Sequence, residues 1–189
     1  VDSGNLAAHL LVLRAGLLAL ADAPLLPSRL LDGLGDTLLL LAGSGSGASA
    51  ARAGQLYQTL DDSPLTANTP LATLQQRLQQ LQREADELVA LAARELGSGS
   101  DIDAGNEAHD WALALQQQCQ QAHDQLLWLA PWLALPSPPP GLDEVRLPST
   151  ASTLQQLATP RQDIRLPEAA TPAQRSWLAE LQQALATGR

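Results

Sequence analysis

The sequence contains no Phe, no Met and no Lys, and aromatic residues make up only 3% of its 189 positions. A hydrophobic core must therefore be built mainly from Leu and Ala, which are the strongest helix formers among the apolar residues. Hydrophobic residues still amount to 45%, which is enough for a chain of this length to bury a core. The composition therefore predicts an all-α protein.

Positive charge and cysteine are also scarce. The 11 basic residues are outnumbered by 20 acidic ones, giving a net charge of −9. This balance disfavours nucleic acid or an anionic membrane surface as a partner. The single cysteine, Cys119, excludes an internal disulfide, and we expect it to be a small buried hydrophobic residue.

No targeting or membrane segment is predicted. The sequence shows no basic leader followed by a small-residue cleavage site, which is the pattern of a secretory signal. Its most apolar stretch, Leu6 to Leu20, is interrupted by His9 and Arg14. It is also shorter than the ~20 residues that typically cross a bilayer, so we expect no membrane span.

Helical patterning recurs from end to end, with Gly, Ser and Pro between the segments. Asp2 or Ser3 is expected to be the N-cap of the first helix, and the run Gly43 to Gly47 is typical of a flexible connector. Three helices are predicted in this part of the chain, over about residues 4–21, 29–43 and 48–60.

The clearest amphipathic helix follows Thr69-Pro70, a typical helix start. Its apolar residues recur at spacings of three and four: Leu71, Leu74, Leu78, Leu81, Ala85, Leu88 and Ala92. A further helix over about 104–130 is expected to bury Trp111, Leu115, Cys119, Ala122, Leu126 and Leu129. The short loop between them predicts an antiparallel helical hairpin over about 70–130 and an antiparallel bundle.

Proline changes the character of the chain after this hairpin. We expect a helical bundle over residues 1–130, a Pro-rich linker over 131–150 and short helices over 151–189. Ser152 with Gln155 could cap one of these helices. The last helix should start at Thr171-Pro172, with Gln174 completing a capping box and Trp177, Leu178, Leu181 and Leu185 on its apolar face.

Candidate chemistry is sparse. Cys119 and His123 have the spacing of a zinc half-site, but no second half-site accompanies them. We therefore predict no metal and no cofactor. The hypothesis of a small metal-dependent enzyme depends on Cys119 and His123 alone. No nucleophile motif follows a strand and no phosphate loop is present, so we assign no catalytic residue. Trp128 and Trp132 are expected in the core, with a carbohydrate platform as the alternative for Trp132.

One local motif resembles a known family. Val1 to Leu11 reads VDSGNLAAHLL, which is similar to a signature of cyclic β-1,2-glucan synthases, large bacterial inner-membrane enzymes. The segments Leu127 to Leu133 and Leu178 to Arg189 also look like stretches of that family. There the signature opens a helix of an (α/α) barrel in the central, glucoamylase-like region. The middle of the chain, 41–105, carries no such likeness.

The resemblance implies that the chain is a non-catalytic helical subdomain, part of or inserted in that barrel. Its partners would be the barrel and membrane parts of the same polypeptide, and β-1,2-glucan. The parent would be a glycosyltransferase or transglycosylase at the cytoplasmic face of the inner membrane. Asp2, Ser3 and Asn5 match the polar positions of the signature and are the expected substrate-binding residues. A stand-alone helical adaptor that binds another protein is the alternative.

Overall fold

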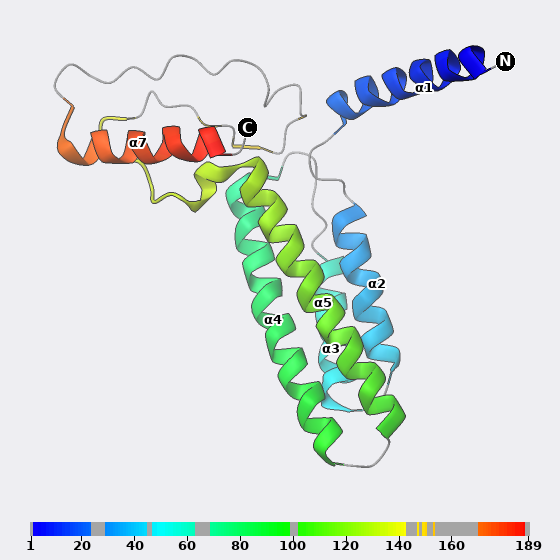
Figure 1. Ribbon diagram of the computed structural model, residues 1–189. Coiled ribbons are helices and arrows are strands. Elements are labelled where there is room, and N and C mark those ends of the chain that lie inside the picture. The colour runs from blue at the N-terminus through cyan, green and yellow to red at the C-terminus, as the bar shows by residue number, and fades with distance from the viewer. Residues whose placement is uncertain are drawn as a thin grey trace.

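The computed structural model describes residues 2–23, 29–44, 47–62, 69–98, 102–142, 147, 149, 150, 153 and 170–187. Its elements are α1 (Asp2–Asp22), α2 (Arg29–Gly43), α3 (Ala48–Asp61), α4 (Leu71–Ser98), α5 (Ile102–Leu129), the 3₁₀ turn η1 (Pro131–Ala134) and α7 (Pro172–Thr187). No strand occurs in these ranges, where Pro70 and Thr150 form only an isolated bridge. The all-α prediction is confirmed (Figure 1).

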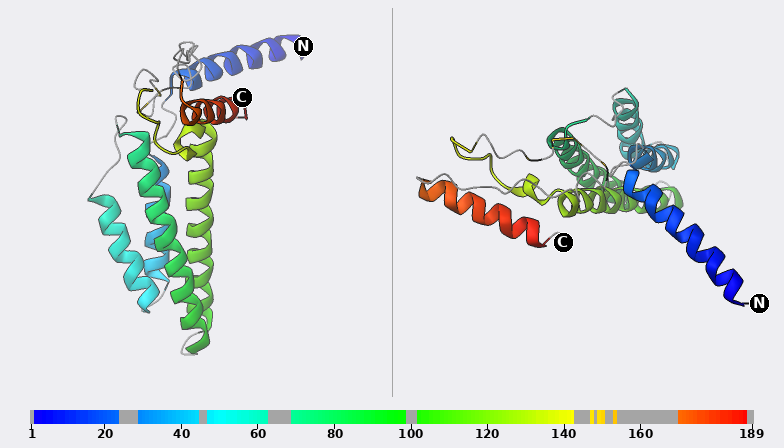
Figure 2. Two further views of the ribbon diagram at one scale, coloured as in Figure 1. Left: turned by 90° about the vertical axis from the view of Figure 1, so that its left-hand side faces the viewer. Right: turned by 90° about the horizontal axis from the view of Figure 1, so that it is seen from above.

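The α4–α5 hairpin is the centre of the fold. The two helices run side by side in opposite directions (Figures 1 and 2). Every apolar residue predicted for the buried face of α4 is buried, because spacings of three and four place them on one stripe of the helix. On α5, Ala108 and Ala112 are buried with the predicted Leu115, whereas Trp111 and Leu129 are only half-buried.

Helices α2 and α3 complete a four-helix bundle at the loop end of the hairpin. Helix α2 packs against α3 and α5, and α3 also contacts α4. The first core cluster lies among them and includes Leu34, Leu38, Leu56, Leu88 and Cys119. The cluster also contains small residues, namely Ala53, Ala85, Ala92, Ala108 and Ala112, and small side chains allow helix backbones to approach closely.

The start of α3 is held by a contact with a residue far away in the sequence. Helix α3 has no side-chain cap at Gly47, but Glu95 of α4 accepts hydrogen bonds from the backbone N–H of Ser49 (3.1 Å) and from its hydroxyl. A Cβ atom on Gly47 would lie 2.5 Å from the Glu95 carboxylate. Ser44, at the end of α2, is buried as well. Glu95 therefore caps α3 from a distant helix, while the middle of the predicted connector, residues 45 and 46, lies outside the described residues.

Glu95→Gln should destabilise the fold in a pH-dependent way. Burial raises the pKa of Glu95, but hydrogen bonds from Ser49 and the Ala48 backbone outweigh it and hold the pKa below the ordinary value of a glutamate. A carboxylate whose pKa is lower in the folded state than in the unfolded state stabilises the fold at pH values above the unfolded pKa. This stabilisation is lost as the pH falls through the folded pKa. We expect the variant to lose about 1 kcal/mol at pH 7, typical of a helix N-cap, and nothing once both states are protonated.

Urea unfolding at a series of pH values measures this difference. Glu87→Gln, at an exposed position of the same helix, is the matched control and should leave stability nearly unchanged. A loss for Glu95→Gln that stays constant down to low pH would contradict the capping role.

A second core cluster joins the other end of the hairpin to α7. It combines Leu74 and Leu78 of α4 with Leu126 of α5, Trp132 of η1, and Trp177 of α7. The indole N–H of Trp177 donates to the carbonyl of Pro136 at 2.8 Å. The Pro-rich stretch is thus packed against α7 through Trp132, Pro136 and Leu142.

The start of α7 was predicted correctly. The backbone N–H of Thr171 donates to Gln174 Oε1 at 2.8 Å, and that of Gln174 donates to the Thr171 hydroxyl at 3.3 Å. This is the reciprocal capping box that the sequence indicates. Trp177, Leu178 and Leu181 are buried. The proposed cap at Ser152 and Gln155 lies outside the described residues.

Helix α1 projects away from the bundle (Figures 1 and 2). Every described side chain from Gly4 to Leu20 is exposed, including seven Leu and Val12, whose exposed fractions lie between 54% and 71%. The helix starts at Asp2, so the backbone of Asp2 and Ser3 belongs to its first turn. Acidic residues are favourable there because the helix dipole is positive at its N-terminus.

Candidate functional site

No catalytic or metal-binding cluster is found in the described ranges. No group of three or more His, Cys, Asp and Glu side chains there could hold a metal ion. Cys119 is fully buried, and its burial, with the nearby Asp86 charge, raises its pKa to about 12. Its thiol therefore stays protonated at neutral pH and is neither a nucleophile nor a ready metal ligand.

The residues singled out by the family resemblance lie together in the first turn of α1. Asn5 is exposed, whereas the side chains of Asp2 and Ser3 are not among those that the structure describes. The structure brings these three positions close in space only because they are neighbours in one helix.

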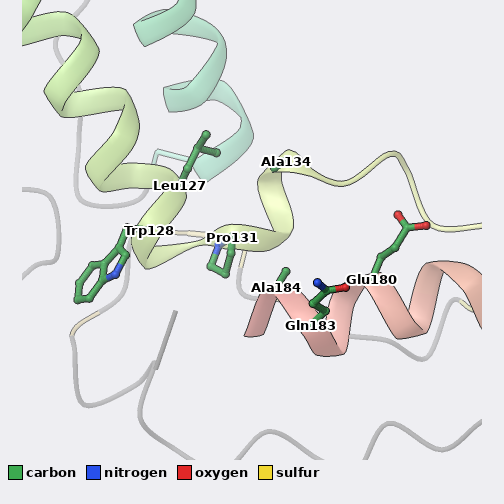
Figure 3. A pocket seen from close by; sticks show the side chains of 7 residues that line it. All are labelled: Leu127, Trp128, Pro131, Ala134, Glu180, Gln183 and Ala184. Atoms are coloured by element: carbon green, nitrogen blue, oxygen red, sulfur yellow. The ribbon is translucent and has the colours of Figure 1, made fainter. Parts of the chain in front are cut away.

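An open, shallow groove lies at the α7 end of the hairpin, within the described part of the chain. Its volume is about 450 Å³, within the range of small-molecule sites. Its walls come from the last turn of α5, from η1 and from α7. It is lined by Leu127, Trp128, Pro131, Ala134, Glu180, Gln183 and Ala184 (Figure 3).

Trp128 is the exposed aromatic residue of this groove. Its side chain is 64% exposed, whereas Trp132 is only 6% exposed in the second core cluster. The sequence-based assignment was therefore wrong for Trp128, which was expected in the core. For Trp132 the expectation of core packing is confirmed, and its burial leaves no face for the carbohydrate platform that was its alternative. Pro131 ends α5 and the 3₁₀ turn that follows swings Trp132 inward, leaving Trp128 on the outer face of the last helical turn.

The polar groups of the groove lie on α7. Glu180 and Gln183 are three residues apart and therefore share one face of the helix, and Glu180 Oε1 accepts a hydrogen bond from the Ser176 hydroxyl at 3.2 Å. Glu180 is the one carboxylate among the lining residues, so the groove lacks the carboxylate pair of a glycoside hydrolase.

Helix α1 is long and apolar enough, from Gly4 to Asp22, to cross a membrane by length and composition. The expectation that this stretch is too short was wrong, because the helix continues past Leu20. Arg14 still lies in its middle, where a charge costs about 2.5–3.5 kcal/mol in a bilayer.

Comparison of the chain with protein-family models, with curated proteins and with solved structures returns no match. The fold and the groove are therefore interpreted from the geometry of this structure alone.

Proposed function

We propose that the chain is a non-catalytic helical subdomain of a cyclic β-1,2-glucan synthase that supports the neighbouring glucan-processing domain. The exposed apolar surface of α1 carries this proposal, together with the VDSGNLAAHLL motif at its start. The bundle and its hairpin would hold and cover the neighbouring barrel, while the sugar chemistry belongs to that barrel.

The distribution of apolar residues on α1 indicates a helix that is enclosed by an apolar environment, which the barrel would supply. Leu10, Leu11, Val12 and Leu13 are consecutive and point to all sides of the helix, and each is more than half exposed. A helix that is hydrophobic all round is normally buried in a protein core or a membrane. Each such side chain would gain about 1.5–3 kcal/mol on full burial, so a surrounding barrel would secure α1 strongly.

In this arrangement Asp2, Ser3 and Asn5 would reach the glucan groove of the barrel from the first turn of α1. The parent enzyme would make cyclic β-1,2-glucan at the cytoplasmic face of the inner membrane.

The alternative, a stand-alone adaptor, relied on the amphipathic face of α4. That face is fully occupied by α5 and by the two core clusters. The feature that favoured the adaptor is thus used inside the bundle, and an adaptor would have to act through another surface, such as the exposed apolar residues of α1.

The open reading frame separates the two functions. A frame that continues far on both sides of the sequence, with membrane spans upstream, supports the synthase subdomain, and a frame of about this size selects the adaptor. The purified chain should neither hydrolyse nor transfer β-1,2-glucan when the products are analysed by chromatography. Measurable turnover would show that the active site lies in this chain.

A further inference from the structure

The outward side of α2 is an open helix face with apolar and acidic side chains. Leu39 is 47% exposed and Leu40, beside it, is 49% exposed. A Cβ atom on Gly43 would meet nothing within 4 Å. The exposed residues of this side recur at spacings of four, three and four, so they form one line along the helix. This α2 stripe consists of Asp32, Asp36, Leu39 and Gly43.

Helix α1 carries a stripe with the same spacing. Its members are all exposed and are apolar except for Arg14, the one Arg of this helix. Among the described residues, neither Arg14 nor Asp36 of α2 takes part in an ion pair. Both charges are therefore available to a partner. The α1 stripe consists of Ala7, Leu11, Arg14 and Leu18.

The two stripes match position by position when the helices are laid antiparallel. Leu11 then lies opposite Leu39, and Arg14 lies opposite Asp36. A parallel arrangement would instead place Arg14 against Leu39 and Leu11 against Asp36, which leaves both charges unpaired. Opposite charges across an interface fix the register of the two partners. The remaining antiparallel pairs are Ala7 with Gly43 and Leu18 with Asp32.

A second copy of the chain can bring these stripes together. Helix α1 projects away from its own bundle (Figures 1 and 2), so it leaves the α2 stripe of the same chain uncovered. Exchange of an identical element between two copies is a low-cost route to a dimer, and two-fold symmetry repeats each contact. A symmetric pair would therefore contain the Arg14–Asp36 contact twice.

We propose that two copies of the chain form a dimer by exchanging α1, with the α1 stripe of each copy packed antiparallel on the α2 stripe of the other. This dimer does not depend on the proposed function, because it uses one side of α1. A second line of exposed residues on a different side of the helix stays available to an enclosing barrel. That line consists of Leu6, Leu10, Leu13 and Leu17.

Sedimentation equilibrium of the full chain over a range of concentrations tests the dimer. Arg14→Glu and Asp36→Arg should each weaken dimerisation by about tenfold or more, because each change places like charges opposite one another twice. The double variant restores opposite charges and should return to within about threefold of the parent chain. Arg94→Glu, at an exposed position of α4, is the matched control and should dimerise like the parent chain.

Disulfide trapping identifies which helices meet. Leu11→Cys and Leu39→Cys are introduced into separate chains, which are mixed and oxidised. The native Cys119 does not compete, because it is buried and its thiol stays protonated. The mixture should form a disulfide between the two variants, because side chains that lie opposite one another can approach closely enough to be bridged. Neither variant alone should form one.

Each alternative gives a different result. A monomer at every concentration, a double variant that stays as weak as the single variants, or absence of the mixed disulfide overturns the exchange. A disulfide that forms only within a chain carrying both substitutions would show that α1 covers its own α2, and one in Leu11→Cys alone would show that α1 pairs with α1. Both results also overturn it. The synthase assignment is unaffected by any of these results, since it is tested by the reading frame.

Discussion

Trp177→Ala should lower the free energy of unfolding by about 3–5 kcal/mol, the usual range for a buried Trp truncated to Ala. Trp177 is 4% exposed in the second core cluster. Its indole also donates the hydrogen bond to Pro136 that fixes the Pro-rich stretch. The substitution removes both, so α7 should detach from the hairpin before the bundle unfolds. Urea unfolding followed by circular dichroism measures the loss, and amide hydrogen exchange should show α7 losing protection first.

Trp128→Ala is the matched control because it removes the same side chain from a largely exposed position. We expect a change within about 0.5 kcal/mol, as for most surface substitutions. Equal destabilisation by the two substitutions would contradict the assignment of Trp177 to the core and of Trp128 to the surface.

Leu88→Ala should destabilise the opposite end of the hairpin by about 2–5 kcal/mol. Leu88 is fully buried in the first core cluster, where α2 and α3 pack on α4 and α5. The cavity cannot be refilled easily because its neighbours on α4, Ala85 and Ala92, are small and equally buried. Loss of hydrogen-exchange protection should be greatest in α2 and α3, and α7 should be little affected.

Leu113→Ala, on the exposed side of α5, is the control for this prediction and should change stability by about 0.5 kcal/mol or less. If Leu88→Ala lowered hydrogen-exchange protection in α7 as much as in α2, the two core clusters would behave as one core. That result would contradict their assignment as separate clusters.

The hairpin was predictable from sequence because its information is local. Spacings of three and four from Leu71 to Ala92 fix the buried face of α4, and Thr171 with Gln174 fixes the start of α7 through side chains three residues apart. Helical periodicity and the capping box both depend on residues three or four positions apart, so they can be recognised without knowledge of the tertiary structure.

The capping of α3 and the position of the groove were not predictable from sequence, because both depend on contacts between residues that are far apart in the chain. Glu95 caps α3 from 46 residues away, and no local pattern indicates that pairing. The sequence reasoning missed Glu180 and Gln183 because they enter the groove only when α7 docks on η1. Their position opposite the apolar stripe of α7 was the one available signal. The burial of Trp132 likewise depends on the turn that follows Pro131.

Helices α1 and α7 both lie near the same end of the α4–α5 hairpin (Figure 1). Each hairpin arm has 28 residues, which is about 42 Å at the rise of an α-helix. The arm ends at Ser98 and Ile102 therefore stand far from both helices. Adding or removing helical turns at these ends should leave the surfaces of α1 and the groove unchanged, so the length of the hairpin can vary without disturbing what binds at its opposite end.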